Sequence, residues 1–280
     1  MLVLQSIKEL RQFRSSLATN EELGLIPTMG ALHKGHLTLL EEAKKKSTKT
    51  IVSIFVNPLQ FNNTSDFDKY PNKREEDLAQ LKAAGCDAVF IPDAKEMYQN
   101  TPVLSFDFGA LSKNMEGLFR PGHFNGVAIV VSKLLNLIKP HKAFFGEKDL
   151  QQLRIIQCVV RDLGIDVSIV PCKTIREDDG LAMSSRNMRL SSEQRDRALA
   201  LYSYLNLAKN MLGTIPHKDI EQQIVLEAKK QARISLEYLN IVDNNTLNPC
   251  VNPLQTKDIA LCIAAFVDEI RLIDNIIVSS

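Results

Sequence analysis

The chain has 280 residues, of which 45% are hydrophobic and 24% charged, and its formal net charge is +1. This is the composition of an ordinary globular protein, long enough for one large domain or two smaller ones. A nearly neutral chain is not built as a general nucleic-acid or membrane binder. The five cysteines form no Cys-x-x-Cys pair, which argues against a disulfide framework or a thiolate zinc site. No apolar run is long enough to span a membrane, so we expect a cytoplasmic protein.

The first three-fifths of the chain alternates between strand-like and helix-like patterns. The strand-like runs are residues 23–26, 50–56, 88–91, 142–146 and 167–170. Helical spacing of apolar residues is found in residues 35–46, 123–138 and 150–163 and in a segment that carries Leu78 and Leu81. Residues 93–122 lack a clear period. Repeated strand–helix–strand units of this length predict a parallel sheet with right-handed crossovers, whose ligands bind beyond the carboxyl ends of the strands.

The pattern changes after Thr174. A polar loop is expected at residues 175–187, and Ser191 begins a capping box for a helix that runs toward Leu212. Residues 218–234 read as another helix. Strand-like runs follow at residues 236–242, 259–267 and 270–278, and Asp268-Glu269 suits a hairpin between the last two. The sequence therefore predicts an α/β fold, with a Rossmann-like parallel-sheet nucleotide-binding domain at residues 1–175 and a smaller α+β domain at residues 176–280.

Four strings of residues fall at the predicted ligand-binding edge. They are Pro-Thr-Met-Gly-Ala-Leu-His-Lys-Gly-His at 27–36, Phe-Val-Asn-Pro-Leu-Gln-Phe at 55–61, Gly-Glu-Lys-Asp-Leu-Gln-Gln at 146–152 and Met-Ser-Ser-Arg-Asn at 183–187. In the first string, His33 and His36 stand where a strand turns into a helix. Backbone N–H groups at a helix start bind phosphate well, and imidazoles beside them can donate to it. The alternative is that both histidines only cap and pack the turn.

The residue types in these strings suit transfer of a nucleotide. His, Lys and Arg side chains can stabilise the negative charge of a triphosphate, and Ser hydroxyls can bind phosphate oxygens. An Asp carboxylate can accept hydrogen bonds from ribose hydroxyls, whereas Gln and Asn amides can orient a small polar acid. Taken singly, Lys148 and Arg186 could equally be solvated loop charges. Gly-x-Gly-x-x-Gly and Gly-x-x-x-x-Gly-Lys-Ser/Thr are both absent from the sequence, which disfavours a dinucleotide oxidoreductase or a P-loop ATPase. The two histidines lack a third partner at metal-ligand spacing, so no protein metal site is expected.

The first string resembles the HIGH signature of adenylylating enzymes. Together with the other three and with Arg-Pro-Gly-His-Phe-Asn-Gly-Val at 120–127, it closely resembles the pantoate–β-alanine ligase family. The resemblance covers nearly all of the first domain and the start of the second. It implies ATP-dependent condensation of (R)-pantoate with β-alanine through a pantoyl adenylate, giving pantothenate, AMP and pyrophosphate. It also implies Mg²⁺ bound with the nucleotide, a homodimer, and a C-terminal domain that acts as a lid.

The resemblance also implies roles for particular residues. The catalytic set is His33, His36, Lys148, Ser184, Ser185 and Arg186. The ATP-binding set is Met29, Gly30, Ala31, Leu32, His33, Lys34, Gly35, His36, Gly146, Glu147, Lys148, Asp149, Ile175, Met183, Ser184, Ser185 and Arg186, with Asp149 at the ribose and Ile175 at the adenine. The pantoate-binding set is Asn57, Gln60, Phe61 and Gln152, and Gln60 would also orient β-alanine.

Three positions depart from the family pattern. Leu150 replaces a usual aromatic residue and is expected to face the core; Asn72 replaces a common Arg, and Asn125 a more usual acidic residue. The nearest alternative function is a HIGH-type nucleotidyltransferase that acts on a phosphate acceptor, for which more Arg or Lys would be expected in place of Gln60 and Gln152. A catalytically idle nucleotide-binding protein is disfavoured because the charged groups are all present. An aminoacyl-tRNA synthetase is disfavoured because the chain lacks a basic appendage.

Overall fold

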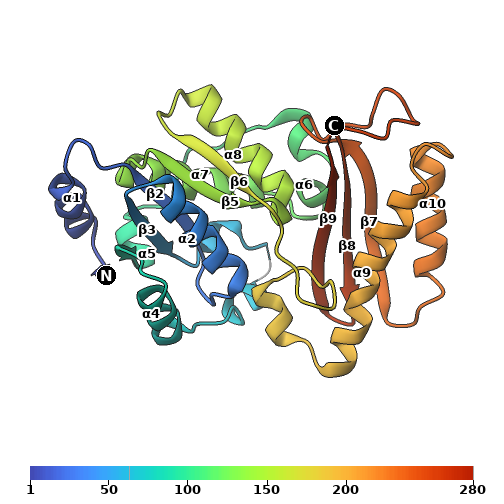
Figure 1. Ribbon diagram of the computed structural model, residues 1–280, viewed down its shortest axis with the longest axis horizontal. Coiled ribbons are helices and arrows are strands. Elements are labelled where there is room, and N and C mark those ends of the chain that lie inside the picture. Colours follow the sequence, from blue (N-terminus) through green and yellow to red (C-terminus); the bar gives the residue numbers. More distant parts are fainter. Residues whose placement is uncertain (63, 280) are drawn as a thin grey trace. The chain divides into compact units, whose positions relative to one another are not determined.

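The computed structural model describes residues 1–62 and 64–279, which form two compact units (Figure 1). Unit 1 comprises Met1–Phe108, Arg120–Glu147 and Ile155–Lys173, and unit 2 comprises Gly109–Phe119, Lys148–Arg154 and Thr174–Ser280. Unit 2 thus includes two short segments that come from the part of the chain before residue 174. The domain limits expected from the sequence stay a prediction, because a domain is defined by independent folding and not by packing alone.

Unit 1 is built on a six-stranded parallel sheet of strand order β1-β4-β3-β2-β5-β6. The strands are β1 (Leu2–Leu4), β2 (Leu23–Thr28), β3 (Lys49–Ile54), β4 (Ala88–Phe90), β5 (Lys142–Gly146) and β6 (Ser168–Cys172). All five strands expected in this part of the chain are present, and the three-residue β1 is an addition. Pro171 lies inside β6, which was expected to end before it. An edge strand tolerates proline because one side of it needs no ladder hydrogen bond.

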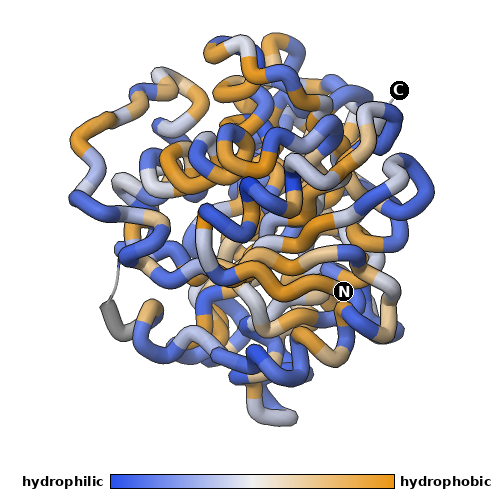
Figure 2. Tube along the Cα trace, turned by 90° about the vertical axis from the view of Figure 1, so that its left-hand side faces the viewer, coloured by the Kyte–Doolittle hydropathy of each residue, from blue (hydrophilic) through white to orange (hydrophobic). Residues whose placement is uncertain are grey.

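Helices follow the strands as a parallel sheet requires. The longer ones are α1 (Ile7–Ser16), α2 (Lys34–Lys46), α4 (Arg74–Ala83), α7 (His123–Ile138) and α8 (Leu150–Leu163). Short helices and 3₁₀ turns lie between them: α3 (Thr64–Asp68), α5 (Ala94–Met97), α6 (Met115–Phe119), η1 (Pro58–Gln60), η2 (Gly109–Ser112) and η3 (Glu147–Asp149). Helix α1 was not expected, although Ser6 and Glu9 form a capping box at its start. Figure 2 shows hydrophobic residues along the strands near the N-terminus and hydrophilic residues along peripheral turns.

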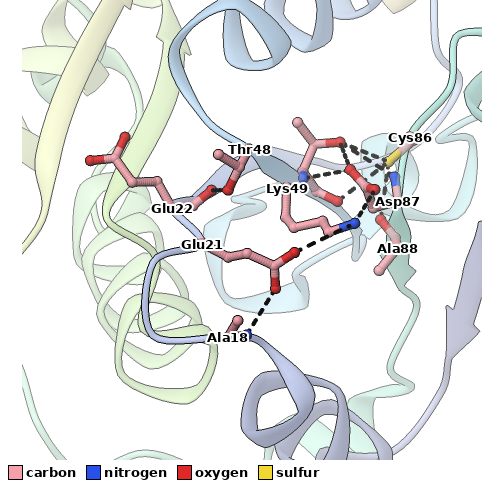
Figure 3. Close-up of polar contacts among 9 residues, drawn as sticks. Ala18, Glu21, Glu22, Thr48, Lys49, Cys86, Asp87 and Ala88 are labelled. Atoms are coloured by element: carbon pink, nitrogen blue, oxygen red, sulfur yellow. Dashed lines mark hydrogen bonds and ion pairs between the residues drawn. The ribbon is translucent and has the colours of Figure 1, made fainter.

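Polar contacts lock the amino-terminal edge of this sheet (Figure 3). The Asp87 carboxylate accepts from Thr50 N at 2.9 Å and from Thr50 Oγ1 at 3.0 Å. Lys49 Nζ lies 3.5 Å from the Asp87 carboxylate and 3.7 Å from that of Glu21. These bonds tie the start of β3 to the start of β4 and so help to fix their register. The candidate residues of unit 1 lie at the opposite, carboxyl-terminal edge of the sheet, where a different set of hydrogen bonds holds the chain.

Unit 2 has an antiparallel sheet of three strands, β7 (Ile234–Asp243), β8 (Ile259–Val267) and β9 (Ile270–Val278), in the order β7-β8-β9. Helices α9 (Ser192–Asn210) and α10 (His217–Ala228) share a hydrophobic core with it. The capping box at Ser191 and the hairpin through Asp268-Glu269 are confirmed. The helix expected at residues 218–234 is wrong at its C-terminal end, because α10 ends at Ala228 and Ile234 already belongs to β7.

The α/β fold class, with a Rossmann-like parallel sheet and a smaller α+β part, is therefore confirmed. Within residues 1–62 and 64–279, no helix combines the length and apolar character needed to cross a membrane.

Candidate active site

A strained turn follows β2 and carries the first residues of the histidine string. Gly30 has a φ of +82° and Ala31 a φ of +50°, and the second value is costly for a residue with a Cβ. The Asp77 carboxylate of α4 holds this turn, since it accepts from Ala31 N at 2.8 Å and from Leu32 N at 2.7 Å. Asp77 is only 1% exposed. Burial raises the pKa of this carboxyl, and the two N–H groups oppose that change.

His33 and His36 cap the helix that starts after the turn. His33 Nδ1 accepts from Gly35 N at 3.2 Å, and His36 Nδ1 accepts from His33 N at 3.4 Å. The two ring centroids lie 4.0 Å apart. A backbone amide can only donate, so each Nδ1 is an acceptor and each neutral ring carries its proton on Nε2. Both histidines thus cap the helix, and this capping also fixes which ring nitrogen is the donor.

The amide of Gln60 points to the same turn. Its Nε2 donates to Met29 Sδ at 3.0 Å, and its Oε1 accepts from Asn57 Nδ2 at 3.2 Å. Asn57, which is fully buried, is held in turn because its Oδ1 accepts from Tyr98 Oη at 2.9 Å. Burial raises the pKa of Tyr98, which keeps the phenol protonated as a donor. This relay leaves the Gln60 Nε2 group as the donor that faces the turn at Met29.

Helix α7 supports the same turn from its backbone side. Gly126 O accepts from Asn57 Nδ2 at 3.1 Å, and a Cβ at Gly126 would lie only 2.2 Å from Leu59 O. His123, which is 5% exposed, has its Nδ1 2.8 Å from Gln60 O. A carbonyl only accepts, so His123 donates through Nδ1. The Arg-Pro-Gly-His-Phe-Asn-Gly string therefore has a structural task, which is to seat the η1 turn.

Phe61 ends the η1 turn and makes edge contacts with two other aromatic rings. Its ring centroid lies 5.4 Å from that of Phe67 and 5.9 Å from that of Tyr70.

Two of the positions that depart from the family pattern also lie in unit 1. Asn125 accepts a hydrogen bond from Phe106 N at 2.9 Å, and Asn72 is exposed. Gly146 and Glu147 lie at the carboxyl end of β5 and the start of η3.

In unit 2, Lys148 and Asp149 lie in the η3 turn, and Gln152 is in the first turn of α8. Lys148 and Gln152 are half-buried, and Asp149 is exposed. The neighbouring Gln151 is buried and donates to Leu111 O at 2.8 Å, so it is a structural residue. Leu150 is 3% exposed, which confirms that it faces the core. Lys148 O accepts from Asn275 Nδ2 of β9 at 2.8 Å.

The last candidate string sits at the end of a tight hairpin. Arg176 pairs with Ala182 across it, and Met183 N donates to Ile175 O at 2.9 Å. Ser184 then caps the 3₁₀ helix η4 (Ser185–Arg189), accepting from Arg186 N at 3.2 Å. The Ser185 side chain is buried, whereas Met183, Ser184 and Arg186 are half-buried.

The structure thus brings together the predicted residues in two groups. Unit 1 holds the turn at residues 29–36 and the amides of Asn57 and Gln60, and unit 2 holds the η3 turn and the residue 183–186 segment. The sequence did not single out the residues that hold these groups: Asp77, Tyr98, Arg176, Asp274 and Asn275. The sequence alone gives no sign that Asp77 is buried, because the other charged residues of its helix are exposed. In the part of the chain described, no three His, Cys, Asp or Glu side chains are grouped as metal ligands would be.

A histidine-capped helix start at the carboxyl edge of a parallel sheet defines the class of α/β nucleotide-binding enzymes. Comparison with known proteins narrows this class. The family model for pantoate-beta-alanine ligase matches residues 2–277. Pantothenate synthetases from Cytophaga hutchinsonii and Bacteroides fragilis are both 44% identical to the chain, over 98% and 99% of it and 99% and 98% of their own lengths.

Solved structures agree with this assignment. Pantothenate synthetase from Thermus thermophilus matches with a TM-score of 0.92 and 39% identity, over the whole of both chains. Pantoate-beta-alanine ligase from Francisella tularensis, described as a complex with beta-gamma ATP and beta-alanine, matches with a TM-score of 0.83 and 33% identity, over 99% of this chain and 97% of that one. The chain belongs to the pantoate–β-alanine ligase family. It is a ligase, and its function is the formation of pantothenate.

Proposed function

We propose that the protein condenses pantoate with β-alanine through a pantoyl adenylate, with the residue roles given below. The observation that carries this assignment is the 3.0 Å contact between Gln60 Nε2 and Met29 Sδ. It puts an amide suited to a small acid at the turn whose continuation is the histidine-capped helix start. An acid and a nucleotide phosphate that react must be bound side by side.

In the first step, a carboxylate oxygen of pantoate attacks the α-phosphorus of ATP. The new bond is O–Pα, the bond from Pα to the bridging oxygen breaks, and pyrophosphate leaves with the electron pair. No proton has to move. His33 and His36 donate through Nε2–H to phosphate oxygens as charge shifts onto them, and the backbone N–H groups of the helix start add to this.

The pantoate carboxylate and hydroxyl are acceptors that suit the donor face of Gln60. Asn57 fixes that face, because it occupies Gln60 Oε1 with its own Nδ2–H. Gln152 is the second amide for pantoate, and Phe61 borders the same ligand. The phosphate acceptor of another HIGH-type nucleotidyltransferase would fit better in an arginine-rich pocket. Neutral amides, in contrast, bind a monocarboxylate without excess positive charge.

Lys148, Ser184, Ser185 and Arg186 bind the triphosphate oxygens, and Mg²⁺ accompanies the nucleotide as part of the substrate. Gly146, Glu147 and Asp149 contact the nucleoside, with Asp149 accepting from ribose hydroxyls, and Ile175 borders the adenine. The ligands named for the Francisella tularensis structure, an ATP analogue and β-alanine, support these substrates.

In the second step, the amine of β-alanine attacks the acyl carbon of the adenylate. A C–N bond forms, the bond between the acyl carbon and the phosphate oxygen breaks, and AMP leaves with the electron pair. The nitrogen loses a proton as the amide forms. Gln60 orients β-alanine, and the products are pantothenate and AMP.

The proposal is tested by following pyrophosphate and AMP separately. With enzyme, ATP, Mg²⁺ and pantoate, pyrophosphate should appear up to the amount of enzyme-bound adenylate, and AMP should accumulate only when β-alanine is added. AMP release at an equal rate without β-alanine contradicts the two-step ligase. A further expectation, a homodimer in the cytoplasm, rests on the family and on composition, and sedimentation of the purified chain measures the first part of it.

A further inference from the structure

The last strand of the chain carries three polar side chains that reach outside its own sheet. They are Arg271, Asp274 and Asn275, in the string Arg-Leu-Ile-Asp-Asn of β9. Asp274 and Asn275 are each 5% exposed. Burying a carboxylate and an amide is costly unless both are bonded, so their partners show what the burial achieves.

Asn275 binds the segment that carries Lys148. Its Nδ2 donates to Lys148 O at 2.8 Å, and the two residues are 127 positions apart in the chain. Lys148 is the middle residue of the three-residue η3 turn. Fixing its carbonyl fixes the peptide plane from which the Lys148 side chain starts. The direction of a long, flexible ammonium side chain depends on that plane.

Asp274 binds the hairpin that leads to the residue 183–186 segment. Its carboxylate accepts from Arg176 Nη1 at 2.6 Å and from Nη2 at 3.0 Å, a bidentate pair. Arg176 Nη1 also donates to Gly180 O at 3.1 Å, and Nη2 to Asn275 O at 3.0 Å. One guanidinium therefore joins the start of the hairpin and its turn to two adjacent residues of β9.

The hairpin has little freedom around this anchor. Gly180 has a φ of +94°, and a Cβ there would lie 2.6 Å from the Tyr202 ring. The Arg176 guanidinium lies over the same ring, 4.0 Å from its centroid. In Figure 1 the segment between β6 and α9 runs beside β9. The anchored hairpin thus sets the direction in which the chain continues after Ala182.

We propose that Asp274 and Asn275 are positioning residues for the adenylation step. They hold the Lys148 turn and the Ser184–Arg186 segment on one rigid strand, so that the two sets of phosphate donors keep a fixed spacing. The inference rests on the proposed roles of Lys148 and of residues 184–186. Its physical reason is preorganisation: groups placed before the substrate arrives cost nothing to arrange during the reaction, and a displacement of ~1 Å costs about a hundredfold in rate.

The competing explanation is that these residues only stabilise unit 2. Coupling between substitutions separates the two explanations, because a residue that acts through Lys148 loses its effect when the Lys148 side chain is absent. Asn275→Ala removes the bond to Lys148 O, and Lys148→Ala removes the ammonium while it leaves that carbonyl in place. Asn240→Ala is the matched control, since Asn240 is a half-buried asparagine of β7 in the same sheet.

Pyrophosphate formation from ATP, Mg²⁺ and pantoate is measured for each single variant and for both double variants, with thermal unfolding as a check of folding. Asn275→Ala should lower the rate at saturating substrates by at least about tenfold in the natural background, and by less than about twofold in the Lys148→Ala background. Asn240→Ala should change the rate by less than about twofold in either. Equal losses for Asn275→Ala in both backgrounds overturn the proposal. A normal rate for Lys148→Ala alone overturns instead the proposed role of Lys148.

Asp274→Asn with Arg186→Ala tests the second anchor in the same way. This change leaves Arg176 without its countercharge and is the harsher one, so Asn275→Ala decides the matter if Asp274→Asn does not fold. A folded Asp274→Asn whose rate loss persists undiminished in the Arg186→Ala background contradicts the positioning role of Asp274.

Discussion

Replacement of Asp77 by alanine should damage ATP use although Asp77 is buried beneath the turn and is no ligand itself. Asp77→Ala leaves the N–H groups of Ala31 and Leu32 without the carboxylate that accepts from them at 2.8 and 2.7 Å. Each orphaned buried N–H costs about 1–3 kcal/mol. Removal of a buried charge and relaxation of the left-handed Ala31 offset part of this sum, so we expect a net loss of about 2–3 kcal/mol in unfolding free energy.

The kinetic effect should exceed what that loss of stability implies. Without Asp77 the turn at residues 29–33 relaxes, and His33 and His36 move with it. A shift of ~1 Å in groups that stabilise a transition state lowers kcat/KM by roughly a hundredfold. The measurement is the rate of pyrophosphate formation against ATP concentration, at a temperature where denaturant titration shows the variant to be folded.

Asp87→Ala is the control, because Asp87 also accepts a backbone N–H but at the opposite edge of the same sheet (Figure 3). It should lower the unfolding free energy by about 1 kcal/mol and leave KM for ATP and kcat within about twofold of their natural values. If Asp77→Ala loses stability yet keeps its kinetic constants in the same range, the reasoning that Asp77 sets the geometry of the turn is refuted.

Three further outcomes are expected. His36→Ala should keep the fold and slow adenylate formation by roughly a hundred- to a thousandfold, about 2.7–4 kcal/mol of barrier; near-normal pyrophosphate exchange would contradict its role. Tyr98→Phe removes the bond to Asn57 Oδ1 and should raise KM for pantoate by about three- to tenfold with KM for ATP unchanged, whereas an equal rise in both would point to a general loss of structure. Because burial raises the pKa of Asp77 above its unfolded value, the folded state binds more protons between the two pKa values. The unfolding free energy of the natural protein relative to Asp77→Asn should therefore increase as pH falls through that window, and a decrease in a denaturant series would exclude the raised pKa.

Local patterns in the sequence were sufficient to predict most of the helices and strands and to locate the candidate strings. The apolar run at residues 142–146 and the helically spaced apolar positions from Leu150 to Leu163 coincide with β5 and α8, because apolar periodicity and flanking Gly and Pro are visible within a short window. The same local view failed at residues 218–234, where a helical period passes into a strand. Only the pairing of β7 with β8 shows that Ile234 belongs to the sheet.

The residues that hold the site in place cannot be recognised within any short stretch of the sequence. Asp77 lies 45 and 46 positions from the amides that it holds, Tyr98 41 positions from Asn57, and Asn275 127 positions from Lys148. Such contacts depend on how strands and loops meet in three dimensions, and an Asp or Asn in a helix or strand reads locally as a solvated residue. The sequence by itself determined which groups are present for the chemistry, because the reacting groups are clustered in short strings of residues. The tertiary structure alone decided what holds those groups in place, because each support is a buried hydrogen bond between distant parts of the chain.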